Sequence, residues 1–144
     1  MDHKKLADDL YVSGQITIDD IQKLASNGVR SIICNRPDHE GVDQPRFDEI
    51  KIAATAFGIE THYLPIVPGQ LSDADVVNFG TALTTLTGPT LAFCKSGARA
   101  VTLWSFLQSQ SMPVADILAS TKAAGYDMSG IEHRIANGGK TPAN

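Results

Sequence analysis

Residues 94–99, Cys-Lys-Ser-Gly-Ala-Arg, combine a nucleophile with groups that bind oxyanions. They follow Thr90–Phe93, an apolar run of strand length, and lead into a segment whose pattern predicts a helix over Ala98–Gln108. Backbone N–H groups at a helix N-terminus bind tetrahedral anions, and arginine adds a planar fork of donors. The same positive surroundings favour the thiolate form of a cysteine. We therefore expect Cys94 to be a catalytic nucleophile and Arg99 its catalytic partner, with a substrate cradle formed by Lys95, Ser96, Gly97 and Ala98.

The polar loop that follows the predicted strand 29–34 supplies further candidates. Parallel strands place their carboxyl ends at one edge of a sheet, so this loop should lie beside residues 94–99. We expect Arg36 to be a second cation and Asn35 to bind substrate, although a turn over residues 35–38 explains the same residue types. The other cysteine, Cys34, ends the buried strand and is expected to pack in the core.

The elements that must position these loops alternate between strand and helix. Strands are expected at residues 10–12, 29–34, 59–66 and 90–93. Helices are expected at 18–26, 45–57, after the capping residue Ser72, at 98–108, from about 113 to Gly125, and at 129–136. This alternation predicts an α/β fold with a mostly parallel sheet flanked by helices. We expect residues 1–137 to form one domain and residues 138–144 to be a disordered tail.

Composition excludes several function classes. The 144 residues carry a formal net charge of −4 without a cluster of Lys and Arg, which disfavours nucleic acid or an acidic membrane as a partner. No apolar run is long enough to span a membrane, and the N-terminus lacks the apolar stretch of a secretory signal, so a cytoplasmic location is expected. The two cysteines and four scattered histidines lack the spacing of a metal site. We expect neither a metal nor an organic cofactor.

Several motifs together carry a family resemblance. Residues 12–17, 35–40, 64–69, 94–99 and 103–104 resemble the phosphatase-like domain family first named from beta-lactamase hydrolase-like proteins, over about residues 10–125. The resemblance implies a fold similar to that of dual-specificity and tyrosine phosphatases, with a cysteine nucleophile. Some members of the family are fused to persulfide dioxygenase domains of sulfide oxidation.

Two features depart from the phosphatase pattern that this resemblance implies. Phosphatases of this fold place five residues between cysteine and arginine, whereas here there are four, the spacing of rhodanese-type sulfurtransferases. Phosphatases also carry a general acid after the preceding strand, but residues 67–70 contain no carboxylate. Asp73 and Asp75 follow, where capping of a helix explains both.

These departures favour a sulfurtransferase that forms a Cys94 persulfide from thiosulfate or a low-molecular-weight persulfide. Its partners would be that small substrate and a sulfur-acceptor protein or a persulfide dioxygenase. The alternative is a cysteine-dependent phosphatase with a phosphocysteine intermediate. A second alternative is an oxyanion-binding module with little catalytic activity.

Overall fold

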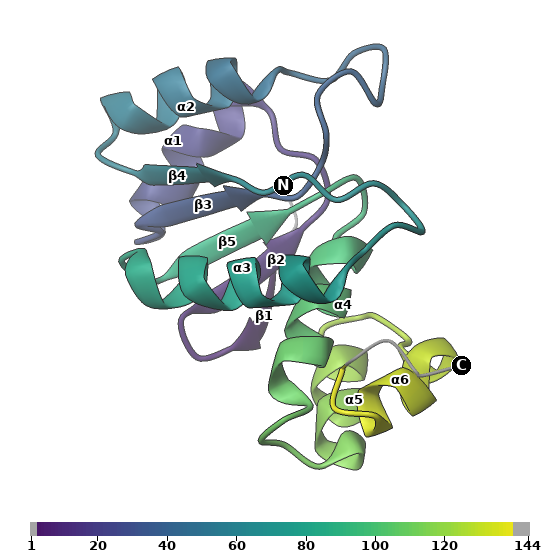
Figure 1. Cartoon of the computed structure of the whole chain (residues 1–144). Coiled ribbons are helices and arrows are strands. Elements are labelled where there is room, and N and C mark those ends of the chain that lie inside the picture. Colours follow the sequence, from purple (N-terminus) through teal and green to yellow (C-terminus); the bar gives the residue numbers. More distant parts are fainter. Residues whose placement is uncertain (1–2, 140–144) are drawn as a thin grey trace.

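The computed structural model describes residues 3–139, and its strands form one twisted sheet (Figure 1). Within these residues the strands are β1 (Lys4–Ala7), β2 (Leu10–Ser13), β3 (Ser31–Cys34), β4 (Glu60–Tyr63) and β5 (Thr90–Phe93). Their order is β1-β2-β5-β3-β4, and every neighbouring pair is parallel except β1 with β2. The mostly parallel α/β sheet predicted from the sequence is confirmed.

Helices cover both faces of this sheet (Figure 1). On one face lie α1 (Ile18–Ser26) and α2 (Phe47–Ala56), and on the other lie α3 (Asp73–Thr85) and α4 (Ala98–Gln108). Beyond α4 pack α5 (Val114–Ala123), the short 3-10 helix η1 (Ser129–Ile131) and α6 (Glu132–Ala136). In residues 3–139 no helix has both the length and the apolar character needed to cross a membrane.

The central strands are buried on both faces, which explains their apolar composition. All four residues of β3 and of β5 are buried. Side chains alternate between faces, so Ile32 and Leu91 join the core beneath α1 and α2, whereas Ile33 and Ala92 join the core beneath α3 and α4. The two cores hold the carboxyl ends of β3 and β5 side by side.

Helix α4 is enclosed on nearly all sides because it lies between the sheet and the C-terminal helices. Val101, Leu103, Trp104 and Phe106 are each at most 3% exposed. A helix packed in this way has little freedom to tilt, so its N-terminus holds a fixed position. The loop of residues 94–99 runs into that N-terminus.

Capping at the start of α3 follows the expectation from sequence. The Ser72 hydroxyl accepts a hydrogen bond from the Asp75 backbone N–H at 3.2 Å, and the Asp75 carboxylate accepts one from the Ser72 N–H at 2.8 Å. This reciprocal pair confirms that Asp75 serves to cap the helix.

Two strand predictions differ from the structure. No strand was expected before residue 10, but β1 pairs antiparallel with β2 despite its two lysines, because it lies at the edge of the sheet, where charged side chains reach water. The strand expected over residues 59–66 is shorter, since β4 ends at Tyr63. Leu64 and Ile66 still donate backbone hydrogen bonds to the carbonyls of Cys34 and Asn35 at 2.9 Å, and the Ile66 carbonyl contacts Arg99.

The C-terminal residues of the described range are ordered by helix capping. Gly138 and Gly139 belong to the segment expected to be disordered, yet their backbone N–H groups bond to the carbonyls of Ile135 and Arg134 at 3.1 and 3.0 Å. Gly139 is also buried. In the structure Gly138 and Gly139 thus have defined hydrogen-bond partners, the disordered tail stays a prediction, and residues 140–144 lie outside the described residues.

Adjacent valines on α3 provide a matched test of this packing. Val76 is 6% exposed and lies in the core, whereas Val77 is 65% exposed. We expect Val76→Ala to lower the free energy of unfolding by about 2 kcal/mol, because two buried methyl groups are lost and a cavity remains. Val77→Ala should change it by less than about 0.5 kcal/mol. Urea denaturation of both variants measures the difference, and equal losses would contradict this placement of α3.

Candidate active site

The 94–99 loop lies where the carboxyl ends of β2, β5 and β3 meet, as the topology predicts. The exit of β2 packs directly on it: the Gln15 N–H donates to the Lys95 carbonyl at 3.2 Å, and the Cys94 N–H donates to the Ser13 carbonyl at 3.4 Å. At Gly14 an added Cβ would lie 2.9 Å from the Lys95 carbonyl oxygen. Glycine is therefore required there for the close approach of the two backbones.

The loop directs a backbone donor at the Cys94 sulfur. The Gly97 N–H donates to Cys94 Sγ at 3.1 Å. Gly97 has a φ of 98°, and a Cβ at this position would overlap the Tyr126 hydroxyl, so only glycine fits. The Tyr126 hydroxyl also donates to the Ser96 carbonyl at 2.9 Å, which fixes the outer side of the loop. Sequence reasoning missed Tyr126, because nothing in its local pattern indicates a contact with a loop 30 residues earlier.

Other donors of the loop point to an oxyanion cradle. Within residues 3–139, no hydrogen bond involves the backbone N–H of Lys95, Ser96 or Arg99. The Ala98 N–H is directed instead to the Ser96 hydroxyl at 3.4 Å. Cys94 has no exposed surface, so a substrate can contact Sγ only after the loop or the side chains above it shift. The structure thus brings the predicted residues 94–99 together in a closed arrangement.

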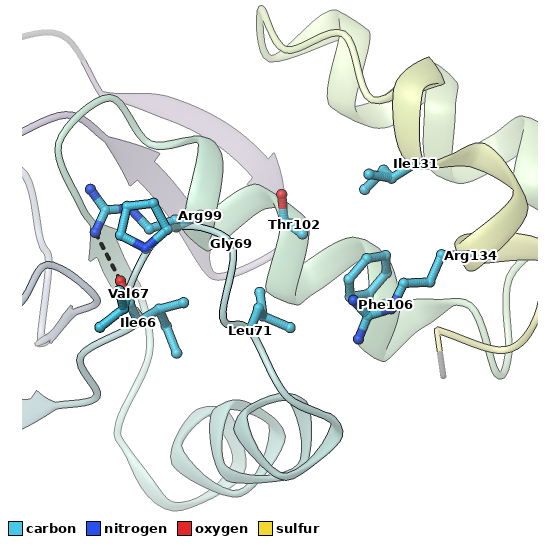
Figure 2. A pocket seen from close by; sticks show the side chains of 10 residues that line it. Ile66, Val67, Gly69, Leu71, Arg99, Thr102, Phe106, Ile131 and Arg134 are labelled. Atoms are coloured by element: carbon cyan, nitrogen blue, oxygen red, sulfur yellow. Dashed lines mark hydrogen bonds between the residues drawn. The ribbon is translucent and has the colours of Figure 1, made fainter. Parts of the chain in front are cut away.

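Arg99 is held at one end of its guanidinium by a carboxylate. Nη1 donates to Glu40 Oε2 at 2.9 Å and Nη2 donates to Glu40 Oε1 at 2.6 Å. Nη1 also donates to the Ile66 carbonyl at 2.9 Å (Figure 2). Nε has no hydrogen bond to any described residue, so Nε and the second hydrogen of Nη2 leave one edge of the fork available. Two parallel N–H groups on one edge match two oxygens of an oxyanion.

Arg36 bonds to the same carboxylate. Its Nε donates to Glu40 Oε1 at 3.0 Å, and its Nη1 donates to Gln15 Oε1 at 3.0 Å. Arg36 is only 7% exposed. The expected substrate-binding cation is therefore engaged by protein acceptors, and it supports Arg99 through Glu40.

Glu40 is a second residue of this site that sequence reasoning missed. The hydrogen bond from Arg99, reinforced by that from Arg36, holds the pKa of Glu40 below its usual value, and the same contact raises the pKa of Arg99. A carboxylate kept ionised in this way does not serve as a proton donor near neutral pH. Its signal in the sequence was slight: a glutamate four residues after Arg36 within a polar loop.

Two residues of β3 and its exit have structural positions. Asn35 was expected to bind substrate, but it is fully buried and its Nδ2 donates to the Leu64 carbonyl at 2.9 Å, which ties the two loops together. Cys34 packs in the core, as expected from the sequence. Burial raises the pKa of its thiol to about 12, so Cys34 remains protonated at neutral pH.

A cavity of about 300 Å³ opens beside Arg99 (Figure 2). It follows α4 past Thr102 and Phe106, and residues 66–71 form another wall. None of the described residues that line it is Asp or Glu. Asp73, a candidate for the general acid, is paired with Arg134 instead. Its Oδ1 accepts a hydrogen bond from Arg134 Nη2 at 3.3 Å. Residues 3–139 also contain no group of three or more His, Cys, Asp and Glu side chains placed to hold a metal ion.

Solved structures confirm the fold. A candidate phosphatase from Neisseria meningitidis superposes with a TM-score of 0.87 and 34% identity, covering 94% of this chain and 96% of that one. Kinase associated phosphatase superposes with a TM-score of 0.70 at 18% identity, covering 94% of this chain and 90% of that one. The second likeness shows the shared fold alone.

Sequence relatives identify the family. Beta-lactamase hydrolase-like proteins of Xylella fastidiosa (strain Temecula1 / ATCC 700964) and Agrobacterium fabrum (strain C58 / ATCC 33970) are 34% and 33% identical to this chain over 121 residues. Those residues are 83% of this chain, which spans only 28% of the length of these relatives. The family model for the phosphatase-like domain of the beta-lactamase hydrolase-like protein matches residues 2–111. The chain therefore belongs to the phosphatase-like domain family of beta-lactamase hydrolase-like proteins.

Proposed function

We propose that this domain is a cysteine-dependent phosphatase that hydrolyses phosphate monoesters through a phosphocysteine at Cys94. The observation that carries the proposal is the alignment of the Gly97 N–H with Cys94 Sγ beside an arginine held at one end by Glu40. The Neisseria meningitidis relative is described as a candidate phosphatase, and the family model is that of a phosphatase-like domain, which supports this function more than the sulfurtransferase favoured by the sequence.

In the first step the Cys94 thiolate attacks phosphorus. The S–P bond forms as the bond to the ester oxygen breaks, and that oxygen leaves with its electron pair and takes a proton from water. The loop amides and the available edge of Arg99 hold the phosphoryl oxygens during transfer. Water then attacks the phosphocysteine, which releases inorganic phosphate and restores the thiolate.

No carboxylate among the described residues near the site is available to protonate a leaving group, so esters with good leaving groups are the favoured substrates. Glu40 is held ionised by two guanidinium groups, and within residues 3–139 no Asp or Glu lines the cavity beside Arg99. Without a proton donor at the ester oxygen, departure of an alkoxide is slow, whereas a phenolate is a weaker base and leaves more readily. Aryl phosphates are therefore the expected substrate class.

Sulfur transfer is the second candidate because the loop has only four residues between Cys94 and Arg99. In that reaction the thiolate attacks the outer sulfur of thiosulfate, an S–S bond forms on Cys94, and sulfite leaves. A thiol acceptor then removes the sulfur. No protonation of the leaving group is required, which is compatible with the absence of a carboxylate donor.

Intact-mass measurement separates the two reactions. After brief incubation with an aryl phosphate and acid quenching, we expect a fraction of the protein to gain the mass of one phosphoryl group on Cys94. Incubation with thiosulfate should leave the mass unchanged. A stable gain of one sulfur, without any phosphoryl adduct, would instead establish sulfur transfer.

Substitution of each cysteine tests the nucleophile. Cys94→Ser should reduce kcat/KM for an aryl phosphate to below about one thousandth, because a serine hydroxyl does not ionise at neutral pH. Cys34→Ser is the matched control and should retain most activity, since burial keeps that thiol protonated. Unchanged circular dichroism spectra would show that both variants fold. Comparable loss in the two variants would contradict the assignment of Cys94.

Glu40→Gln tests whether the carboxylate positions Arg99. We expect kcat/KM to fall about 10- to 100-fold, because the guanidinium loses the charged partner that orients it. Inhibition by inorganic phosphate should weaken in parallel. The control is Glu49→Gln, which removes the same charge from an exposed pair with Arg46 and should have little effect. If the loss of negative charge mattered more than orientation, Glu40→Gln would bind phosphate more tightly, and the positioning role would be wrong.

A further inference from the structure

The cavity beside Arg99 has a second cation at its far end. Figure 2 shows Arg99 and Arg134 at opposite ends of the space, with Thr102 between them and Phe106 beside Arg134. Arg134 comes from α6, whereas Arg99 lies in the first turn of α4. No motif in the sequence connects the two arginines, and neither the phosphocysteine chemistry nor the 94–99 loop uses Arg134.

Arg134 is only partly neutralised by its surroundings. Its guanidinium carbon lies 4.2 Å from the centroid of the Phe106 ring, a cation–π contact that orients the side chain. Its ion pair is with Asp73 at 3.3 Å, and that carboxylate side chain is 53% exposed. The Arg134 side chain is 22% exposed, and its Nε is buried without a hydrogen-bond partner among the described residues. The positive charge of Arg134 therefore lies at the cavity, and few protein acceptors compete with a ligand for it.

The spacing between the two cations follows from the helix. Arg99 and Phe106 both line the cavity and are seven residues apart on α4, so their backbones are separated by about 10 Å along the helix axis. Arg134 stacks on Phe106 and so lies at the Phe106 end of the cavity. A phosphate monoester that reaches both arginines therefore needs an extended body with an anion at each end.

The walls between the two cations are mainly apolar. Ile66, Leu71 and Ile131 contribute side chains there, and the volume of about 300 Å³ accommodates a substituted aromatic ring. None of the described lining residues is Asp or Glu, and the Asp73 carboxylate that lies against Arg134 is paired with it. The size of the cavity, its apolar walls and the positive charge of Arg134 therefore fit a ligand with an aromatic ring and an acidic group at the end away from the phosphate.

We propose that this cavity is a leaving-group subsite in which Arg134 binds a second anionic group of an aryl phosphate substrate. The inference rests on the proposed phosphatase function and adds a substrate class: aryl phosphates with a carboxylate or similar anion at the end of the body opposite the phosphate. Arg134 then determines specificity, while Cys94 and Arg99 act on the phosphate.

Two matched substrates test the proposal. The first is 3-(4-phosphonooxyphenyl)propionate, and the second is its primary amide, which has the same body and a similar leaving group without the distal charge. We expect kcat/KM of the wild-type protein to be about 5- to 10-fold higher for the carboxylate. Raising the ionic strength should reduce this preference toward one, because the contact is partly exposed. Equal kcat/KM for the two substrates at low salt would overturn the proposal.

Variants assign the preference to Arg134. Arg134→Gln should reduce the carboxylate-to-amide ratio to about one, and Arg134→Lys should retain part of it. Arg30→Gln is the control, because Arg30 is exposed and precedes β3 at the opposite edge of the sheet, and it should keep the wild-type ratio. Thermal melting monitored by circular dichroism checks the fold of each variant. If Arg134→Gln does not fold, Arg134→Lys and the salt dependence of the wild-type ratio decide the question. A ratio that persists in folded Arg134→Gln would overturn the proposal.

Binding distinguishes failure of this inference from failure of the phosphatase function. Calorimetry with Cys94→Ser uses the non-hydrolysable 3-(4-(phosphonomethyl)phenyl)propionate and its amide. Tighter binding of the carboxylate without turnover by the wild-type protein would support the subsite and reject the phosphatase function. Turnover of both substrates with equal binding of both analogues would support the phosphatase function and reject the subsite.

Discussion

The site depends on one carboxylate shared by two arginines. Glu40 Oε1 accepts from both Arg36 and Arg99, and Oε2 accepts from Arg99 alone. Through these bonds the exit of β3 is joined to the start of α4, and through Gln15 to the exit of β2. Charged groups that are largely removed from water are stable only when paired, so each member of this network requires the others. The orientation of Arg99 is therefore a property of three loops together.

The same pairing limits the chemistry available. A carboxylate that balances two guanidinium groups stays ionised and has no proton to donate, and the one carboxylate seen near the far end of the cavity is paired with Arg134. The described cavity thus offers no side chain for acid catalysis, so the reaction rate depends on how readily the leaving group departs without protonation. An apolar space beside Arg99 that suits an aromatic ring is consistent with that requirement. The short loop and the missing acid, which favoured sulfur transfer from the sequence, are also compatible with a phosphatase restricted to aryl esters.

Helix α4 connects the loop to the C-terminal helices. Its N-terminus follows the cysteine loop, its buried side chains anchor it between two layers, and its residues Arg99, Thr102 and Phe106 line the cavity. The segments that pack outside it supply Tyr126 to the loop and Arg134 to the far end of the cavity. These C-terminal residues lie outside residues 2–111, the part that the family model matches, so the family match alone does not identify the features that would set specificity.

The sequence by itself determined most of the elements and the residue types of the 94–99 loop, because these depend on neighbours close along the chain. The helices Ile18–Ser26 and Ala98–Gln108, the capping of α3 by Ser72 and Asp75, and the strand before Cys94 follow from periodicity and capping residues within a few positions of each other. The tertiary structure alone decided the partners of the arginines and the loop. Glu40 is 59 residues from Arg99, and Tyr126 is 30 residues from Ser96. It also decided that Asn35 faces a carbonyl within the protein and that Arg36 reaches Glu40. Local sequence patterns do not predict such contacts, because the contacts form only when the sheet and its helices bring distant segments to one edge.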